Sequence, residues 1–225
     1  MRDSILIGSK SGVRFAGHPA GAPYRYDFSE QHITWSCEQS LQRMGIDTID
    51  LYQLHRPDWL ADWEEVAAAF SKLKSSGKVR EFGVSNFRPS QVVALQSALG
   101  DPLLVNQVEI SLVCLDRFTD GTLDQCQTTG MTPLAWSPLG GGKLLAADTV
   151  DAPLAALLEE TATRHGTTPS NIALAWLMRH PSGIIPIVGS TNPLRIREAT
   201  IACEVKLTRE EWYALLEAAR GVRLP

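Results

Sequence analysis

The stretch Ile49-Asp-Leu-Tyr-Gln-Leu-His-Arg-Pro-Asp58 sets the fold expected for the rest of the chain. Its first residues predict a buried strand, which ends before Pro57, because proline lacks an N–H and disfavours a helical residue before it. His55 is therefore expected where a strand passes into a loop. In a parallel barrel that end of a strand carries the chemistry. A strand-end histidine can equally hydrogen-bond a backbone carbonyl as a structural residue, so this stretch alone leaves both roles open.

Segments with strand character alternate with segments of helical periodicity on both sides of this stretch. The other expected strands are 5–10, 79–85, 104–110, 132–136 and 184–188. Helices are expected at 29–44, 62–77, 89–99, 122–129, 153–165, 170–179, 193–202 and 209–220, the second of them opened by a capping box of Asp62 and Glu65.

This alternation is typical of a parallel sheet with helical crossovers. It predicts an α/β fold of the (β/α)8 TIM-barrel type that is incomplete, with about six of the eight β/α units. Because no Pro/Ser-rich linker divides the chain, residues 1–225 are expected to form a single domain.

Composition limits the functional classes. The chain has 225 residues, 44% of them hydrophobic, with 20% charged residues and a formal net charge of -4. That balance gives no support for a nucleic-acid or anionic-membrane partner. The apolar runs are too short for a membrane span or a signal peptide. The cysteines form no C-x-x-C pair, so we expect reduced thiols in a cytoplasmic protein and no metal site; they are Cys37, Cys114, Cys126 and Cys203.

Polar side chains stand where the apolar strands end. Each is a weak signal alone, but together they predict a ring of hydrogen-bonding groups at one mouth of a parallel barrel. Lys10 could extend its ammonium group to solvent, but beside His55 on a neighbouring strand a catalytic role becomes credible. The residues of the ring are Lys10, His55, Ser85, Asn86, Asn106, Gln107, Glu109, Trp136, Ser137, Gly189 and Ser190.

A second informative patch follows the last strand. Asn192 can cap a helix whose first residue is Pro193, and a helix N-terminus favours an anion. Arg195 and Arg197 oppose the helix dipole there, which a bound phosphate would explain better than a solvated surface would. Trp136 could be a core residue or a stacking platform for a flat ring, and the glycines at 140–142 permit close approach of a ligand.

Six motifs carry a family resemblance over essentially the whole chain. They are Ser9-Lys10, Asp50-Leu-Tyr-Gln-Leu-His55-Arg-Pro-Asp58, Gly83-Val-Ser-Asn-Phe87, Asn106-Gln-Val-Glu-Ile-Ser111, Trp136-Ser-Pro-Leu-Gly-Gly141 and Ile187-Val-Gly-Ser-Thr-Asn-Pro-Leu-Arg195. The chain resembles the aldo-keto reductases, in particular an NADPH-dependent bacterial oxidoreductase branch with an HRPD motif. The resemblance implies hydride transfer from NADPH to an aldehyde or ketone, and a small-molecule carbonyl substrate.

The resemblance also implies roles for individual residues. Lys10 and His55 match two members of the family's catalytic group of Asp, Tyr, Lys and His. The cofactor set it implies is Ser85, Asn86 and Gln107 at the nicotinamide carboxamide, Trp136 stacked on the nicotinamide, Ser137, Leu139 and Gly141 along the pyrophosphate, and Gly189, Ser190, Arg195 and Glu198 at the adenosine end and its 2′-phosphate.

Two departures soften the preference for NADPH, so NADH is not excluded. The family often has a lysine where this chain has Gly189, and an asparagine where it has Ala199. The preference for the 2′-phosphate then rests mainly on Arg195.

A larger departure is expected at the front of the chain. The residues resemble the family from its third strand onward, so we expect a truncated barrel without the first two β/α units and without the catalytic Asp and Tyr. Tyr24, Tyr26 and Asp27 are not the matching residues, although the loop that carries them could border the substrate. This predicts poor carbonyl reduction, and the alternative is a non-catalytic nucleotide-binding or interaction protein. Unpaired barrel edges would then favour self-association.

Overall fold

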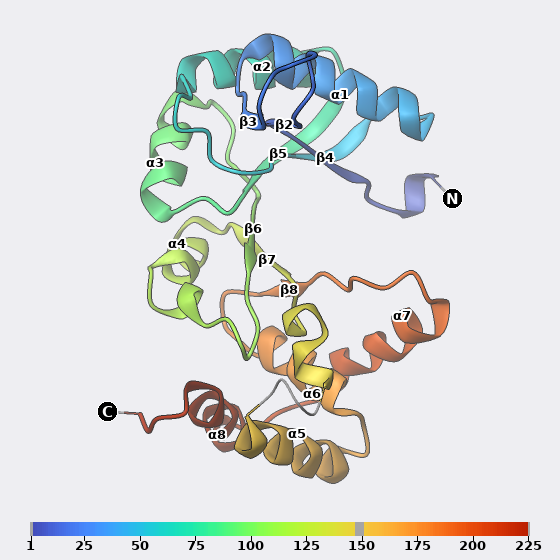
Figure 1. Ribbon diagram of the computed structural model, residues 1–225, viewed down its shortest axis with the longest axis vertical. Helices are drawn as coiled ribbons and strands as arrows, with labels where there is room; N and C mark the ends of the chain where they lie inside the picture. The colour runs from blue at the N-terminus through green and yellow to red at the C-terminus, as the bar shows by residue number, and fades with distance from the viewer. Residues whose placement is uncertain (1, 147–150, 225) are drawn as a thin grey trace. The chain divides into compact units, whose positions relative to one another are not determined.

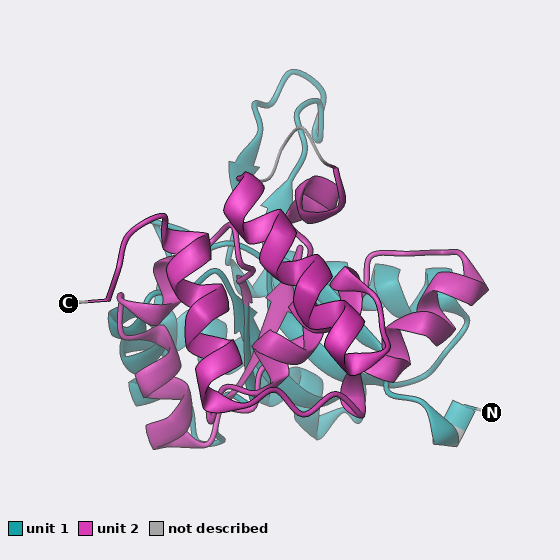
Figure 2. Cartoon of the chain, turned by 90° about the horizontal axis from the view of Figure 1, so that it is seen from below, with its two compact units in different colours: residues 1–107 teal, residues 108–225 magenta. Residues whose placement is uncertain are grey.

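The computed structural model describes residues 2–146 and 151–224. The chain falls into two compact units, residues 1–107 and 108–225 (Figure 2). Six strands follow one another in the order β1-β4-β5-β6-β7-β8, and strand β6 contributes residues to both units. The predicted α/β class with a six-stranded parallel sheet is thereby confirmed. The single-domain organisation stays a prediction.

The first unit contains strands β1 (Gly8–Ser11), β4 (Ile49–Leu54), β5 (Val79–Ser85) and the start of β6 (Val105–Glu109). They pair in parallel, with Gly8 opposite Leu51 and Leu54 opposite Val84. Helices α1 (Glu30–Met44), α2 (Trp63–Ser75) and α3 (Pro89–Ala98) connect them (Figure 1). This strand–helix order brings the carboxyl ends of the strands to one edge.

The core of this unit follows from the apolar residues of α1, α2 and β4. Tyr52 and Leu54 are fully buried, and the Tyr52 hydroxyl donates to the carbonyl oxygen of Ile33 on α1 at 3.2 Å. Phe70 on α2 stacks on Phe82 of β5, with ring centroids 3.9 Å apart. The Tyr52 hydrogen bond joins β4 to α1, and His55 follows directly after the last residue of β4.

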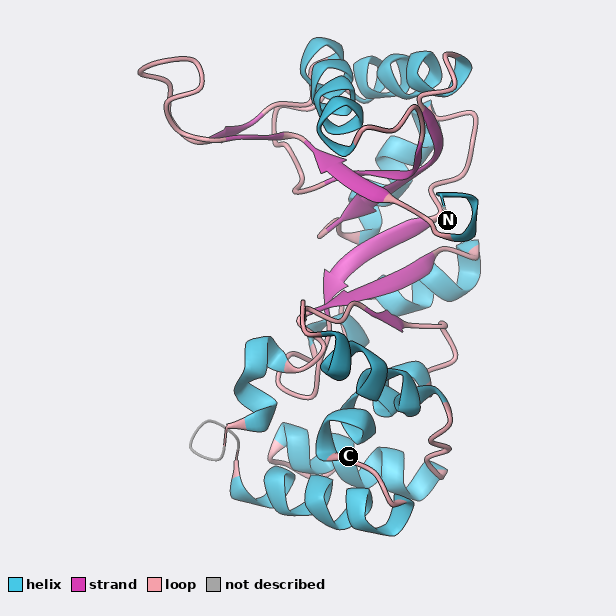
Figure 3. Ribbon diagram, turned by 90° about the vertical axis from the view of Figure 1, so that its right-hand side faces the viewer, coloured by secondary structure: helices cyan, strands magenta, loops and turns pink. Residues whose placement is uncertain are grey.

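The second unit contains β7 (Thr132–Trp136), β8 (Ile185–Pro186) and five helices among its described residues, with 3-10 turns at Asp116–Phe118, Gly140–Leu145 and Ile201–Cys203. Leu134 of β7 lies opposite Ile185 of β8 in a parallel pair. Figure 3 shows how helical this part of the chain is. The helices are α4 (Thr122–Thr129), α5 (Ala152–His165), α6 (Pro169–Met178), α7 (Pro193–Thr200) and α8 (Arg209–Arg220).

Helix α6 is the centre of the second unit, since every residue from Asn171 to Leu177 is buried. Trp176 on α6 and Trp212 on α8 stack at 5.0 Å with an interplanar angle of 9°. Each indole N–H donates to the other residue's carbonyl oxygen, at 3.0 and 2.9 Å. Both polar groups are therefore satisfied inside an apolar core.

The strands at the two ends of the sheet are shorter than predicted. Strand 5–10 was wrong at its start, because β1 begins at Gly8 while Ile5 and Leu6 are exposed beyond the paired segment. A short 3-10 turn at Arg2–Ser4 precedes them. Strand 184–188 was wrong in length, since the pairing with β7 covers only Ile185 and Pro186.

Two local features also differ from expectation. Asp62 caps α2 by accepting from the Glu64 N–H, while Glu65 accepts from the Glu30 N–H on α1, so the predicted capping box was wrong. The loop after β1 contains an antiparallel pair, β2 (Val13–Arg14) with β3 (Arg25–Tyr26), that was not predicted and that extends away from the sheet (Figure 3).

None of the helices in the described part of the chain has the length and apolarity that a membrane crossing requires.

Candidate functional site

Lys10 and His55 lie at the carboxyl ends of two paired strands. Lys10 is opposite Gln53 in the β1–β4 register, and the His55 N–H donates to the Ser11 carbonyl oxygen at 2.9 Å. Both side chains line one pocket of about 690 Å³. The structure therefore brings together the two residues for which a catalytic role was predicted.

The protein environment disfavours the charged forms of both groups. Burial lowers the pKa of Lys10. The pKa of His55 is lowered first by partial burial of the ring and then by the Lys10 and Arg56 cations, although the side chain is exposed overall. The ordinary pKa of histidine is 6.5, so the His55 imidazole is neutral at neutral pH and can donate a hydrogen bond through one ring nitrogen.

The other residues that line this pocket include apolar side chains, such as Phe15 and Trp35, together with polar and basic ones. Among the described residues, the lining includes no tyrosine and no carboxylate. The basic residues beside Lys10 and His55 are Arg14, His18, His32 and Arg43. An electron-rich oxygen is therefore favoured in this pocket.

The ends of β5 and β6 form a hydrogen-bonded group in the same unit. Ser85 Oγ donates to the Gln107 carbonyl oxygen at 2.7 Å, and the Asn86 N–H donates to that oxygen at 2.9 Å. Asn86 Nδ2 donates to Ser85 Oγ at 2.9 Å and to the His55 carbonyl oxygen at 3.3 Å. Three predicted cofactor residues thus share one network with the backbone of His55.

The conformation of Asn86 explains how it makes these contacts. Its φ of 60° is in the left-handed region, which asparagine tolerates better than most residues do. Asn106 belonged to the predicted polar ring, but it is fully buried and its Nδ2 donates to the Phe87 carbonyl oxygen at 2.9 Å. Asn106 is therefore a structural residue.

The second unit contains a pocket of about 630 Å³. It is formed by the loop after β7, the segment after β8, the start of α6 and the first turns of α7. Seven of the predicted cofactor residues line it, namely Ser137, Leu139, Gly141, Gly189, Ser190, Arg195 and Glu198.

Local sequence explains the shape of this pocket. The positive φ values of Gly141 (66°) and Gly142 (95°) turn the backbone as only glycine does easily. Asn192 caps α7 by accepting from the Leu194 N–H at 2.9 Å, as predicted. Ser190 Oγ in turn accepts from the Asn192 N–H at 3.2 Å. Arg195 is thereby held in the first turn of α7, with no salt bridge among the described residues.

Two residues that were expected to contact the cofactor do not line this pocket. Trp136 is half-buried but is not among the residues that line it, and neither is Arg197. Sequence reasoning missed the start of α6, where Thr168, Ser170 and Asn171 line the pocket. The signal was present, because Thr168 followed by Pro169 is a typical helix start, and Thr168 Oγ1 accepts from the Asn171 N–H at 3.3 Å.

Within the described residues, no group of three or more His, Cys, Asp and Glu side chains is placed to hold a metal ion. The chemistry of the two pockets is instead that of hydrogen-bond donors and cations. The residues of the second pocket fit a phosphate-bearing nucleotide, because they combine Arg195, which forms no salt bridge within the described residues, with a glycine-rich turn and capped helix starts.

Comparison with known proteins agrees with this geometry. The model described as "Aldo/keto reductase family" matches residues 1–220. The chain is 43% identical over 226 residues to a 6-dehydroglucose reductase of Novosphingobium aromaticivorans, covering 100% of this chain and 72% of the relative. It is 42% identical over 228 residues to the oxidoreductase YdhF of Escherichia coli, covering 100% of this chain and 76% of the relative.

A solved structure agrees as well. The crystal structure of the thermostable aldo-keto reductase Tm1743 superposes with a TM-score of 0.83 at 29% identity, over 97% of this chain and 73% of that chain. The fold and site define an α/β oxidoreductase of TIM-barrel type. The chain belongs to the aldo/keto reductase family, whose members reduce carbonyl groups with nicotinamide cofactors.

Proposed function

We propose that this chain contains the carbonyl-binding and NADPH-binding residues of an aldo-keto reductase that acts on small aldehydes or ketones. One observation carries the proposal. Lys10 and His55 end neighbouring parallel strands and line one pocket, while Ser85, Asn86 and Gln107 are hydrogen-bonded to each other and to the His55 backbone.

In the proposed reaction the bound NADPH supplies the hydride. His55 donates a hydrogen bond to the carbonyl oxygen from its neutral imidazole, which fixes the orientation of the substrate. The Lys10 ammonium stabilises the negative charge that develops on that oxygen. Ser85, Asn86 and Gln107 would hold the nicotinamide carboxamide, and Trp136 would stack on its ring.

The oxygen must also take up a proton, which solvent water would supply in this pocket, so the reaction is expected to be slow. The described lining of the pocket offers neither a tyrosine nor a carboxylic acid. The depressed pKa of His55 leaves little imidazolium at neutral pH to act as an acid. From this pocket lining we propose slow turnover.

The pocket of the second unit would bind phosphate and adenosine groups of the cofactor. Ser137, Leu139 and Gly141 would follow the pyrophosphate, with Gly189, Ser190 and Glu198 at the adenosine end. The Arg195 guanidinium would contact the 2′-phosphate and favour NADPH over NADH. The support for this role is that Arg195 lines the pocket and lies in the first turn of α7.

The substrate class rests on the relatives and on three polar residues of the first pocket. Two relatives at 43% identity are named 6-dehydroglucose reductase. Ser36, Gln39 and Arg43 line the pocket beside His55 and suit the hydroxyl groups of an oxidised sugar. We therefore propose a sugar-derived aldehyde as the substrate to test first.

The test is NADPH consumption with 6-dehydroglucose and with a simple aldehyde. We expect saturable NADPH binding and slow consumption that Lys10→Met or His55→Ala lowers at least tenfold, roughly 1.4 kcal/mol of transition-state stabilisation. Lys206→Met, an exposed lysine outside both pockets, should leave the rate unchanged. Turnover at ordinary enzyme rates of about 1–1000 s⁻¹ would overturn the proposal that the reaction is slow. Failure to bind NADPH would overturn the function.

A non-catalytic nucleotide-binding protein is the second candidate. The absence of a tyrosine or a carboxylate from the described pocket lining favours it. It predicts NADPH binding of the same strength with no consumption above the rate of the Lys10→Met variant.

A further inference from the structure

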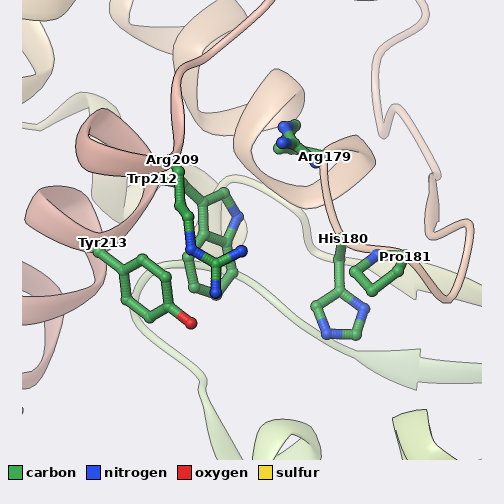
Figure 4. Close-up of a pocket in the computed structure, with 6 residues that line it drawn as sticks. All are labelled: Arg179, His180, Pro181, Arg209, Trp212 and Tyr213. Carbon is green, nitrogen blue, oxygen red and sulfur yellow. The ribbon is translucent and has the colours of Figure 1, made fainter.

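A third pocket lies in the second unit, among residues that the reductase function does not use. Its volume is about 230 Å³, and Figure 4 shows its six lining residues. Arg179, His180 and Pro181 come from the end of α6 and the loop that leads into β8. Arg209, Trp212 and Tyr213 come from the first turns of α8. It shares no lining residue with the pocket of Arg195.

The polar groups of this pocket are donors. Arg179 Nε donates to the Leu207 carbonyl oxygen at 3.3 Å. Arg209 is exposed, and its guanidinium lies 5.3 Å from the centre of the Tyr213 ring. In the described part of the chain neither arginine forms a salt bridge. Arg209 also stands in the first turn of α8, where a cation opposes the helix dipole.

His180 adds a neutral donor. Its Nδ1 accepts from the Ser182 N–H at 3.3 Å and lies 2.8 Å from Ser182 Oγ. The proton of the neutral ring is therefore assigned to Nε2. Burial lowers the pKa of His180, while the Asp124 carboxylate on α4 opposes that shift. At neutral pH the ring then offers one N–H and no charge.

The remaining surface of the pocket is made of flat apolar rings. Trp212 is held by its stack on Trp176 and by the reciprocal indole hydrogen bonds. Tyr213 meets Trp212 edge-on, with ring centroids 5.0 Å apart. Pro181 contributes a third ring. Because the Trp212 ring is already fixed by the core, a ligand that stacks there loses little affinity to ordering the protein.

From these contacts we infer that this pocket binds a small aromatic carboxylate. The carboxylate would take the paired terminal donors of Arg209, and the ring would lie against Trp212 and Tyr213. The volume favours a single-ring ligand, since pockets for larger ligands usually measure about 300–1,000 Å³. The chain passes from this pocket through β8 to the segment of Gly189, which lines the pocket of Arg195. The two pockets share no lining residue, so they are separate sites.

The test is calorimetric titration of the whole chain with sodium benzoate, in the presence and absence of saturating NADPH. We expect saturable binding in the millimolar range or tighter, with and without NADPH. Arg209→Ala should weaken it at least fivefold. Arg220→Ala removes the same charge from the last turn of the same helix and should have no effect. Tyr213→Phe keeps the ring and should still bind benzoate, because the inference assigns the contact to the ring and not to the hydroxyl group.

Each of the following results would overturn the inference. The first is the absence of saturable binding below about 10 mM, an affinity too weak for a built site. The second is an equal loss in Arg209→Ala and Arg220→Ala, which would indicate only the net charge of the helix. The third is equal affinity for acetate, or loss of benzoate binding when NADPH is bound. Failure of NADPH binding alone would overturn the reductase proposal and leave this one intact.

Discussion

The backbone N–H of His55 donates to the carbonyl oxygen of Ser11 over 2.9 Å. This bond closes the β1–β4 ladder one residue beyond the last strand pair, Ser11 with Leu54. It sets the position of His55 relative to Lys10 by backbone geometry rather than by side-chain contacts. The pair is therefore built into the sheet, and its electrostatic coupling is open to measurement.

The first prediction concerns the pKa of His55. Burial lowers it most, and the Lys10 cation lowers it further because it disfavours the imidazolium. Lys10→Met removes that cation, so the pKa of His55 should rise toward the ordinary 6.5 in an NMR titration of the histidine resonances. Lys206→Met is the matched control and should leave it unchanged. A fall of the pKa in Lys10→Met would contradict the coupling.

The second prediction concerns Asp50, whose side chain is 4% exposed at the start of β4. It accepts from the Ile7 N–H at 2.9 Å and pairs with Arg2 and Arg80 at 2.8 and 2.9 Å. Asp50→Ala should lower the free energy of unfolding by about 1–3 kcal/mol in urea titrations, because it removes the acceptor of the part-buried Ile7 N–H and the ion-pair partner of two arginines. Arg80→Ala, which removes the more exposed partner, should cost less.

The lowered pKa of Asp50 also predicts how the free energy of unfolding changes at acid pH. The Ile7 hydrogen bond and then the two arginines lower its pKa below the ordinary 3.8. A carboxyl with a lowered folded-state pKa stabilises the fold above its unfolded pKa, and that contribution is lost as the pH falls below about 4. In Asp50→Ala the unfolding free energy should therefore depend less on pH in this range. An unchanged dependence would assign the acid response to other carboxylates.

The third prediction concerns Gly83, in the middle of β5. A Cβ there would lie 2.4 Å from Val105 Cγ2 and 2.9 Å from the Val105 carbonyl oxygen, and backbone atoms cannot move aside cheaply. Gly83→Ala should destabilise the protein by about 1–3 kcal/mol in the same urea titration. Gly100→Ala, where a Cβ meets nothing within 4 Å, is the control. Equal stability of both variants would show that β5 and β6 can separate.

The fourth prediction concerns self-association. Strand β1 ends the sheet order, and Leu6, just before it, is 85% exposed. Such edges favour pairing with another chain. We expect concentration-dependent oligomers in size-exclusion chromatography with light scattering, and a shift toward monomer in Leu6→Lys. Leu60→Lys, at a 93% exposed position in a loop, should not produce that shift. A clean monomer of the unmodified chain at high concentration would count against the prediction.

Much of the fold could be predicted because its signals are local. Helix α1 begins after Ser29 and ends at Gly45, whose φ of 62° is the left-handed cap that glycine favours. The hydrophobic periodicity and the capping residues that predict the other helices also lie close together in the sequence. The end of β4 could be predicted for the same reason, since Pro57 lies three residues beyond its last residue.

Features that depend on contacts distant in sequence could not be predicted. Glu65 bonds to Glu30 across 35 residues instead of completing the cap of α2. Asn106 had the same polar signal as Gln107, but it points into the core and bonds to Phe87. The pocket of Arg209 and His180 joins two helix ends whose spacing in the sequence carries no motif.

The most direct test of the account is an NADPH titration, followed by cofactor fluorescence, of the unmodified chain and of Arg195→Ala and Arg197→Ala. Both arginines lie on α7, but only Arg195 lines the pocket of the second unit. We predict saturable binding that Arg195→Ala weakens about tenfold for NADPH and little for NADH, while Arg197→Ala leaves it within twofold; a tenfold loss is roughly 1.4 kcal/mol. No saturable binding, or equal losses in the two variants, would contradict the proposed cofactor site.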